Sequence, residues 1–315
     1  MDQHTDLVEP LALDEAFLDV SLPAPTLDRA AELARHIRQQ IFDDLGLGSS
    51  VGVATNKFIA KLASVDAKPV ASPNGVQPGP GVVVVAAGDE FDYVQRLEVG
   101  RLWGVGPKSR EKLSKVGIRT VRDVTSMPRE VLRAQVGEAL THQLIELANG
   151  RDNRPVVPDR EAKSIGHEET FGIDLSDVDA LHGELIRMID IVAGRVRSGV
   201  GGARTWSIKV RRNDFTTVTR SRTWDQPVAS ASEVAPALDA LLANAVAGHP
   251  VRLLGVSASG FGVPSEQLDL FSDVGAERGR RDKAVDEVRE RFGGDAIRLA
   301  GSMKSTDRDF PPSRR

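Results

Sequence analysis

Two adjacent carboxylates, Asp14 and Glu15, lie within an otherwise apolar stretch, VEPLALDEAFLDVS at residues 8–21. Charged side chains among leucine and phenylalanine are costly to bury unless a positive group lies against them. The pair therefore predicts a site that needs a positive partner. The alternative is an ordinary strand edge at which both carboxylates face water.

The stretch GVGPK, from Gly104 to Lys108, is typical of a phosphate-binding helix start. Gly106 and Pro107 open one helix, KVGI forms a hairpin, and a second helix begins at Thr120. Free backbone N–H groups at such a start hold nucleic-acid phosphates without reading base sequence, as in a helix-hairpin-helix element. The alternative is a glycine-rich turn that serves only packing.

A second candidate for phosphate binding is a basic pair of strands between Ala203 and Arg222. Its single acidic residue is Asp214, although the whole chain carries a net charge of -4. Such a local excess of positive charge predicts contact with a polyanion, and the alternative is a solvated outer face. The candidate residues are Arg204, Lys209, Arg211, Arg212, Arg220 and Arg222, with Lys163 and His167 on the neighbouring strand.

A short apolar motif, QLDLF, lies in the polar region that follows residue 261. It consists of Gln267, Leu268, Asp269, Leu270 and Phe271. These side chains are too few to build a core, so they predict docking into an apolar pocket on a partner protein. A helix is predicted in the charged sequence after the motif.

The elements that must position these residues begin with an α/β pattern. A strand over 15–21 precedes a helix that opens near Thr26 and stops at Gly46. The sequences SSVGVAT, NKFIAKLASVDAK and VVVV then predict a strand, a helix and a buried strand, with a turn at SPNG. A further helical stretch is predicted from Pro128 to Ala148 beside the helical hairpin.

The second half of the chain follows a different pattern. NGRDNRPVVPDREA, residues 149–162, is polar and holds two prolines, so it predicts a linker between domains. A strand in SIGHEETF, a helix over 177–197, two long strands, a helix and a last strand follow. This order predicts a small α+β sandwich in which two helices cover one sheet.

Composition sets wider bounds. A chain of 315 residues is long enough for two or three domains. The absence of cysteine excludes disulfides and thiolate metal sites. Neither a signal peptide nor a stretch of membrane-spanning length is evident, and the acidic net charge confines any nucleic-acid surface to local patches.

Taken in order, EPLALDEAFLDV, VGVATNKFIAKLAS followed by AKP, RLWGVGPKSREKLSKVGI, the basic strands and QLDLF make the chain similar to Y-family DNA polymerases of the DNA polymerase IV (DinB) type. The resemblance runs from about residue 5 to residue 271. It implies an α/β and α+β multidomain fold. The domains would be a partial palm at 1–98, a helix-hairpin-helix thumb at 99–150, a linker at 151–162, a little finger at 163–262 and a tail at 263–315 with a clamp-binding motif.

The resemblance also implies roles for the candidate residues. Asp14 and Glu15 would ligate Mg2+ between the primer 3′-hydroxyl and the phosphates of the incoming dNTP, in a two-metal site. Lys68, in AKP, would contact the triphosphate, and its alternative is an ordinary surface lysine. Thumb and little finger would hold template-primer DNA. QLDLF would bind the sliding clamp, the beta subunit of the replicative polymerase.

Three departures from the family pattern accompany these matches. Ala12 replaces a usual serine, and ASVDAKPVASPNG carries extra residues beside Lys68. In the family, a strand with a further metal-binding aspartate, a steric-gate aromatic residue and the fingers lie upstream of the carboxylate pair, whereas Met1 is near it. Asp19 has a spacing that does not place it on the same face as Asp14. The sequence thus predicts an incomplete metal site with little or no nucleotidyl transfer.

Two functions follow as expectations. The first is an error-prone DNA-directed DNA polymerase for lesion bypass (translesion synthesis), which binds template-primer DNA, dNTP and the clamp. The alternative is a catalytically impaired, truncated homologue that serves only as a DNA- and clamp-binding module. In either case we expect a monomer of the bacterial cytoplasm that associates with the nucleoid and has no membrane contact.

Overall fold

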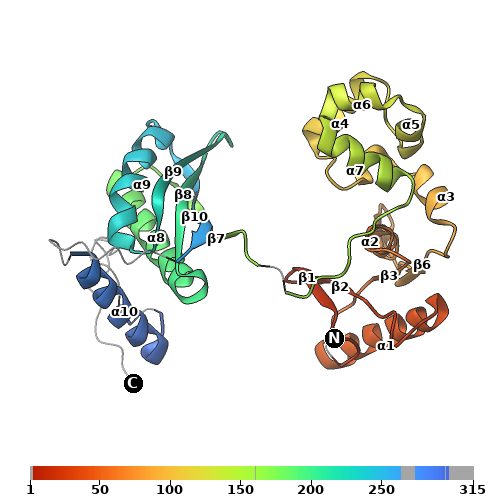
Figure 1. The fold of residues 1–315 in the computed structure, drawn as a ribbon, viewed down its shortest axis with the longest axis horizontal. Coiled ribbons are helices and arrows are strands. Elements are labelled where there is room, and N and C mark those ends of the chain that lie inside the picture. Colours follow the sequence, from red (N-terminus) through yellow and green to blue (C-terminus); the bar gives the residue numbers. More distant parts are fainter. Residues whose placement is uncertain (1–2, 160, 264–273, 295, 298–315) are drawn as a thin grey trace. The chain divides into compact units, whose positions relative to one another are not determined.

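The computed structural model describes residues 3–159, 161–263, 274–294 and 296–297 (Figure 1). The chain divides into two compact units, Met1–Arg160 and Glu161–Arg315. Within the described ranges, no helix is both long and apolar enough to cross a membrane. QLDLF lies outside the described residues.

The first half of unit 1 mixes short strands with helices. β1 (Val8–Ala12) and β2 (Glu15–Leu18) form an antiparallel hairpin, and β3 (Val51–Val53) pairs in parallel with β6 (Val82–Val84). The remaining elements are α1 (Leu27–Leu45), α2 (Lys57–Asp66), β4 (Val70–Ser72), β5 (Gly75–Gln77), α3 (Glu90–Gln95) and the 3-10 helix η1 (Val99–Arg101).

Local signals set the ends of the two longer helices as predicted. Thr26 accepts from the Arg29 backbone N–H at the start of α1, and Gly46 ends it in the left-handed region at φ 68°. Asn56 accepts from the Ile59 N–H at the start of α2. The prediction that residues 82–85 are a buried strand is wrong for Val84, which is 40% exposed, because β6 pairs only with β3 among the described strands.

Four short helices complete unit 1: α4 (Pro107–Lys115), α5 (Val121–Ser126), α6 (Arg129–Val136) and α7 (Glu138–Ala148). The predicted helical stretch from Pro128 to Ala148 is two helices, because Gly137 adopts φ 82° and turns the chain between them. Leu113, Ile118 and Leu132 are fully buried in one core shared with Phe58 of α2. The helices therefore pack on the α/β part as one body.

Unit 2 is a sheet with helices on one face, as the strand and helix order predicts (Figure 1). Its strands are β7 (Ser164–Leu175), β8 (Gly202–Arg212), β9 (Thr217–Val228) and β10 (Val251–Gly262), in the antiparallel order β7-β10-β8-β9. The helices are α8 (Val178–Val200), α9 (Ala231–Val246) and α10 (Val274–Phe292).

The core of unit 2 lies between the sheet and helices α8 and α9. Trp206 and Ile208 of β8 are fully buried against Leu185 and Met188 of α8. α10 is attached by charge: Arg197 of α8 donates two hydrogen bonds of 2.7 Å to Asp286. One face of the sheet is therefore closed by helices, and the functional question concerns the other face.

Candidate functional site

The carboxylate pair lies at the tip of the β1–β2 hairpin. Leu13 and Asp14 form the turn and are exposed, and Glu15 is the first residue of β2. The expected strand over 15–21 is shorter than predicted and ends at Leu18. Asp19 accepts a 3.0 Å hydrogen bond from the Ser21 backbone N–H, a local turn that ends the strand.

Lysine side chains supply the positive charge beside this pair. Lys61 Nζ of α2 lies 2.5 Å from Glu15 Oε1, and Lys68 Nζ lies 3.9 Å from the same oxygen. The hydrogen bond from Lys61, together with the charges of both lysines, lowers the pKa of Glu15 against a weaker opposing effect of burial. Glu15 is thus held as a carboxylate, and the structure brings Asp14, Glu15 and Lys68 into one place.

The donor set fits a cation that is shared with a substrate. Among the described residues, no group of three or more histidine, cysteine or acidic side chains could hold a metal ion. Asp14 and Glu15 nevertheless offer carboxylate oxygens, and Mg2+ is commonly bound by one or two carboxylates plus substrate phosphates. These residues therefore suit a cation that arrives with a phosphate ligand, not a cage built only from protein.

A buried ion pair that the sequence did not reveal anchors the same hairpin. Glu9 of β1 is 1% exposed, and its Oε2 accepts from Lys57 Nζ at 2.6 Å and from the Val157 backbone N–H at 2.9 Å. The signals were an acid in the strand sequence VEPLA and a lysine four residues before Lys61. Neither signal identified its partner, because the contacts join segments far apart in sequence.

Trp103 connects the hairpin to the segment that precedes α4. Its ring centroid lies 6.1 Å from that of Phe17 in β2 and 5.6 Å from that of Phe58 in α2. The guanidinium of Arg154 lies 4.5 Å above the Trp103 ring, a cation-π contact. This aromatic cluster therefore connects the carboxylate hairpin to the residue that directly precedes the GVGPK stretch.

The GVGPK stretch forms the helix start that the sequence predicts. Gly104 has φ 92°, a left-handed conformation that other residues rarely adopt, so the backbone geometry favours glycine. Gly106 is the N-cap of α4, has no side-chain capping bond, and leaves open space where a Cβ would be. Lys108 is exposed beside it. The first N–H groups of α4 are therefore accessible to an anion.

The predicted basic residues of unit 2 divide between the two faces of the sheet. Cross-strand partners point to the same side of a sheet. Arg220 and Arg222 are the cross-strand partners of the buried Ile208 and Trp206, so they point to the side that the helices cover. Lys209 and Arg211 alternate with the buried positions of β8 and so lie on the open face. The even spacing of residues along each strand decides this division.

Two of the predicted residues have roles within the fold of unit 2. Arg212 donates from Nε and Nη2 to the Ala245 carbonyl at 3.2 and 2.8 Å, at the end of α9. The Nε2 atom of His167 is buried without a hydrogen-bond partner in the structure. Burial, then repulsion from Arg187 and Arg195, lowers the pKa of His167, so it is neutral near pH 7. Neither side chain adds free positive charge to the open face.

Hydroxyl groups dominate the open face. One row across the strands is Ser164, Ser259, Thr205 and Thr223, and the next contains Ser257, Ser207 and Ser221. In the following row Lys209 Nζ reaches Glu168 at 2.8 Å across Gly255, which has no side chain between them. Arg204 and Lys163 are exposed near the ends of β8 and β7. The face therefore combines many hydroxyls with few free cations.

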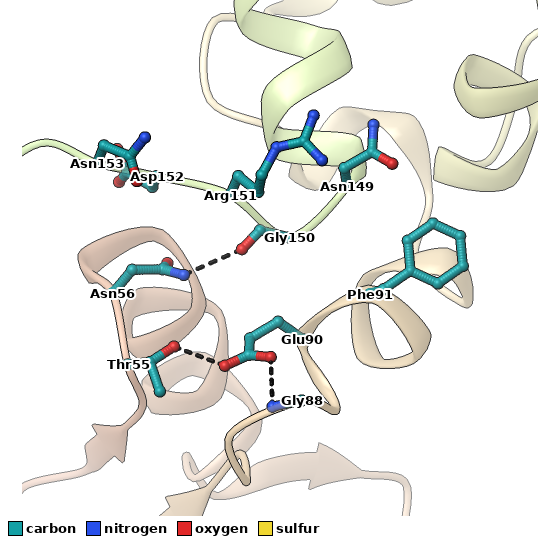
Figure 2. A pocket seen from close by; sticks show the side chains of 10 residues that line it. All are labelled: Thr55, Asn56, Gly88, Glu90, Phe91, Asn149, Gly150, Arg151, Asp152 and Asn153. Carbon is teal, nitrogen blue, oxygen red and sulfur yellow. Dashed lines mark hydrogen bonds between the residues drawn. The ribbon is translucent and has the colours of Figure 1, made fainter.

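A polar pocket of about 330 Å³ lies where α2, α3 and the end of α7 meet (Figure 2). Glu90 accepts from Thr55 Oγ1 at 2.6 Å and from the Gly88 N–H at 2.8 Å. Asn56 donates to the Gly150 carbonyl at 3.0 Å. These hydrogen bonds link the start of α2 to α3 and to the segment that follows α7. The pocket is therefore part of the packing that fixes α2, the helix that carries Lys57 and Lys61.

Comparisons with known proteins connect both units to one family of enzymes. The impB/mucB/samB family matches residues 1–65, and the impB/mucB/samB family C-terminal domain matches residues 162–270. DNA polymerase IV of Desulfatibacillum aliphaticivorans is 38% identical over 303 residues, which cover 95% of this chain and 74% of the relative. DNA polymerase IV of Alkalilimnicola ehrlichii is 41% identical over 275 residues, or 85% and 74%.

Solved structures show a similar fold. A Y-family DNA polymerase chimera of Dbh and Dpo4 has a TM-score of 0.69 at 24% identity, covering 83% of this chain and 73% of that chain. An insertion ternary complex of Dbh DNA polymerase has a TM-score of 0.50 at 23% identity, with the same coverage. These neighbours agree with the predicted mixture of helix and sheet.

Proposed function

Because the chain belongs to the Y-family DNA polymerases of the DNA polymerase IV (DinB) type, which are metal-dependent DNA-directed DNA polymerases, we propose that it extends DNA primers opposite damaged templates. The observation that carries the proposal is the Asp14–Glu15 pair at an exposed hairpin tip, with Lys61 and Lys68 beside Glu15. Its substrates are template-primer DNA and dNTP, and its cation is Mg2+.

Asp14 and Glu15 are the proposed ligands of the cation. Bound Mg2+ supplies charge stabilisation to the attacking and leaving oxygens of the in-line displacement. The hairpin orients the two carboxylates, and Lys61 holds one oxygen of Glu15. Lys68 has a side chain that is 54% exposed and lies near Glu15, so it suits contact with the triphosphate of the dNTP.

The start of α4 is the proposed contact with the DNA backbone in unit 1, which supports the thumb assignment of residues 99–150. Its uncapped N–H groups, the open space at Gly106 and the exposed Lys108 suit a phosphate. Such a contact positions the duplex without reading its sequence, as a template-directed enzyme requires.

The open sheet face is the proposed DNA contact of unit 2, which supports the little-finger assignment of residues 163–262. Serine and threonine hydroxyls donate to phosphate and sugar oxygens, and Lys209, Arg211, Arg204 and Lys163 add charge. Arg220 and Arg222 are exposed on the edge strand β9 but point to its helix-covered side, so they suit a backbone phosphate beyond the edge of the sheet and not the open face itself. Arg212 and His167 are left out of this surface because of their roles in the fold.

The wider setting is proposed from the sequence. QLDLF would dock into an apolar pocket of the sliding clamp, with Leu270 and Phe271 as the apolar anchors. The enzyme would act as a monomer near the bacterial nucleoid. Replacing Leu270 and Phe271 by alanine is expected to remove clamp binding and leave DNA binding unchanged, and an unchanged clamp affinity would contradict the assignment.

Primer extension by the purified chain tests the activity. We expect dNTP-dependent product with Mg2+ on an undamaged template and on a template with an abasic site, and loss of both products in Asp14→Ala. If the chain binds template-primer DNA but gives no product with Mg2+ or Mn2+, the DNA-binding module replaces the polymerase. If product forms only on the undamaged template, polymerase activity remains and the lesion-bypass role is wrong.

A further inference from the structure

The β1–β2 hairpin depends on contacts outside its own two strands. A two-stranded hairpin is marginally stable alone, and β1 and β2 pair only with each other among the described strands. The turn that carries Asp14 is exposed. The position of the carboxylates is therefore decided by the element against which the hairpin packs.

Besides Val157 and Trp103, the hairpin contacts α2 through two lysines that we call the lysine pair, Lys57 and Lys61. They are four residues apart and so lie on one face of the helix. Lys57 Nζ is 2.6 Å from Glu9 Oε2, and Lys61 Nζ is 2.5 Å from Glu15 Oε1. Each lysine thus holds a different strand of the hairpin.

The hairpin presents one face to the lysine pair. Glu9 is the cross-strand partner of Phe17, and Glu15 is two residues before Phe17 on the same strand. These three side chains therefore point to the same side. Lys57 Nζ also lies 5.4 Å from the centroid of the Phe17 ring. Because Lys57 and Lys61 have an i,i+4 spacing on α2, they reach Glu9 and Glu15 on this one face of the hairpin. The two contacts together fix the position of the hairpin along the helix.

The two ion pairs differ in burial. The side chains of Lys57 and Glu9 are 12% and 2% exposed, whereas those of Lys61 and Glu15 are 23% and 35% exposed. The first pair is inaccessible to a cation and serves the fold. The second pair is open to solvent at the oxygens of Glu15, where a cation would bind.

We propose that Lys61 is a positioning residue for the reaction. It fixes the Glu15 carboxylate before the cation arrives, and its ammonium competes with that cation for the negative charge of Glu15. The inference rests on the proposed metal-binding role of Asp14 and Glu15. Lys61 lowers the affinity of the site for the free cation, since its ammonium neutralises Glu15. In exchange, it keeps Glu15 in the geometry that the reaction needs.

Removing Lys61 separates this role from a merely structural one. In Lys61→Met, which keeps an unbranched side chain but removes the ammonium, we expect the affinity for Mn2+ to rise about threefold to tenfold. The kcat of primer extension at saturating Mg2+ is expected to fall about tenfold, and the half-saturating Mg2+ concentration is expected to fall as well. Loss of a structural contact alone would weaken cation binding and kcat together.

Mn2+ binding to the full chain, measured by electron paramagnetic resonance of the free ion, gives a readout without catalysis. Lys115→Met is the matched control, because Lys115 forms an exposed ion pair with Glu111 on α4. This substitution removes the same charge as Lys61→Met, but away from the site. Its Mn2+ affinity is expected to equal that of the wild type. Circular dichroism melting verifies that each variant folds, and Lys61→Gln replaces Lys61→Met if the latter does not.

Glu15→Gln distinguishes the inference from the proposal beneath it. If Glu15→Gln binds Mn2+ as well as the wild type, the proposed metal site is wrong. If Glu15→Gln loses binding while Lys61→Met and Lys61→Gln bind like the wild type or more weakly, the metal site stands and the role of Lys61 is overturned.

Discussion

In unit 1 the polar residues of the candidate site are charged and held by opposite charges, whereas on the open sheet face of unit 2 they are mostly neutral hydroxyls. Glu9 and Glu15 each have a lysine within 2.6 Å. The sheet face instead presents rows of serine and threonine, with Lys209 engaged by Glu168. Chemistry at a phosphate needs charges at fixed positions, while holding a duplex of any sequence needs many weak donors.

The largest expected effect lies at the hairpin tip and would separate catalysis from binding. Asp14→Asn is expected to reduce primer extension by about a thousandfold, because it removes a charged ligand of the cation. DNA affinity, measured by fluorescence anisotropy, is expected to stay within about twofold, since the phosphate contacts lie elsewhere. Asp19→Asn is the matched control, because the Asp19 carboxylate accepts hydrogen bonds from Ser21 in a local turn. Equal activity in Asp14→Asn and Asp19→Asn would contradict the assignment.

A second prediction concerns the difference between the two lysine contacts. Glu9→Gln leaves the Lys57 charge buried without a counter-charge, so β1 and β2 are expected to lose about 2–4 kcal/mol of local stability. Hydrogen-exchange mass spectrometry of the hairpin measures this. Lys61→Met, at the more exposed pair, is expected to change the local stability of the hairpin, measured in the same way, by less than about 1 kcal/mol.

The double variant Glu9→Leu with Lys57→Met provides the control for this prediction. It replaces both charges with apolar groups and is expected to regain much of the loss. If Glu9→Gln exchanges as slowly as the wild type, the buried pair does not anchor the hairpin.

A third prediction uses two neighbouring arginines on opposite faces of the sheet. Arg211→Glu, on the open face, is expected to weaken binding to all DNA sequences alike by about tenfold and to flatten its salt dependence. Arg212→Ala removes two hydrogen bonds to the Ala245 carbonyl, so it is expected to cost about 1 kcal/mol of stability in unit 2. Its DNA affinity is expected to remain within about twofold. Equal DNA-binding losses in both variants would contradict the division of the faces.

The sequence predicts those features that depend on local signals. Helix limits followed from Thr26, Gly46, Gly106 and Thr120. The break at Gly137 was missed because a helical pattern continues on both sides of it. Local signals are sufficient where a cap or turn is set by neighbours in the chain.

The site was only partly predictable for a different reason. The carboxylate pair and Lys68 were found from motifs, but the partners of Glu9 and Glu15 on α2 were not. Those contacts join residues 48 and 46 positions apart, from Glu9 to Lys57 and from Glu15 to Lys61, and no periodicity encodes them. The basic strands likewise gave a charge count without a face, since the register between β8 and β9 decides which residues share a side.

The smallest expected effect is on the pH dependence of the stability of unit 2, which His167 on the closed face of the sheet is expected to cause. The pKa of His167 lies below its ordinary value of 6.5, because burial and then Arg187 and Arg195 disfavour the charged ring more than Glu169 and Glu184 favour it. The unfolded chain therefore binds more protons than the folded chain below pH 6.5, so the free energy of unfolding falls as the pH drops.

His167→Gln is expected to flatten this decline in urea titrations of unit 2 between about pH 7 and about pH 5.5, whereas the exposed His249→Gln control should leave it unchanged. A decline of the same slope in His167→Gln and the wild type would show that the buried ring on the closed face does not couple protonation to folding.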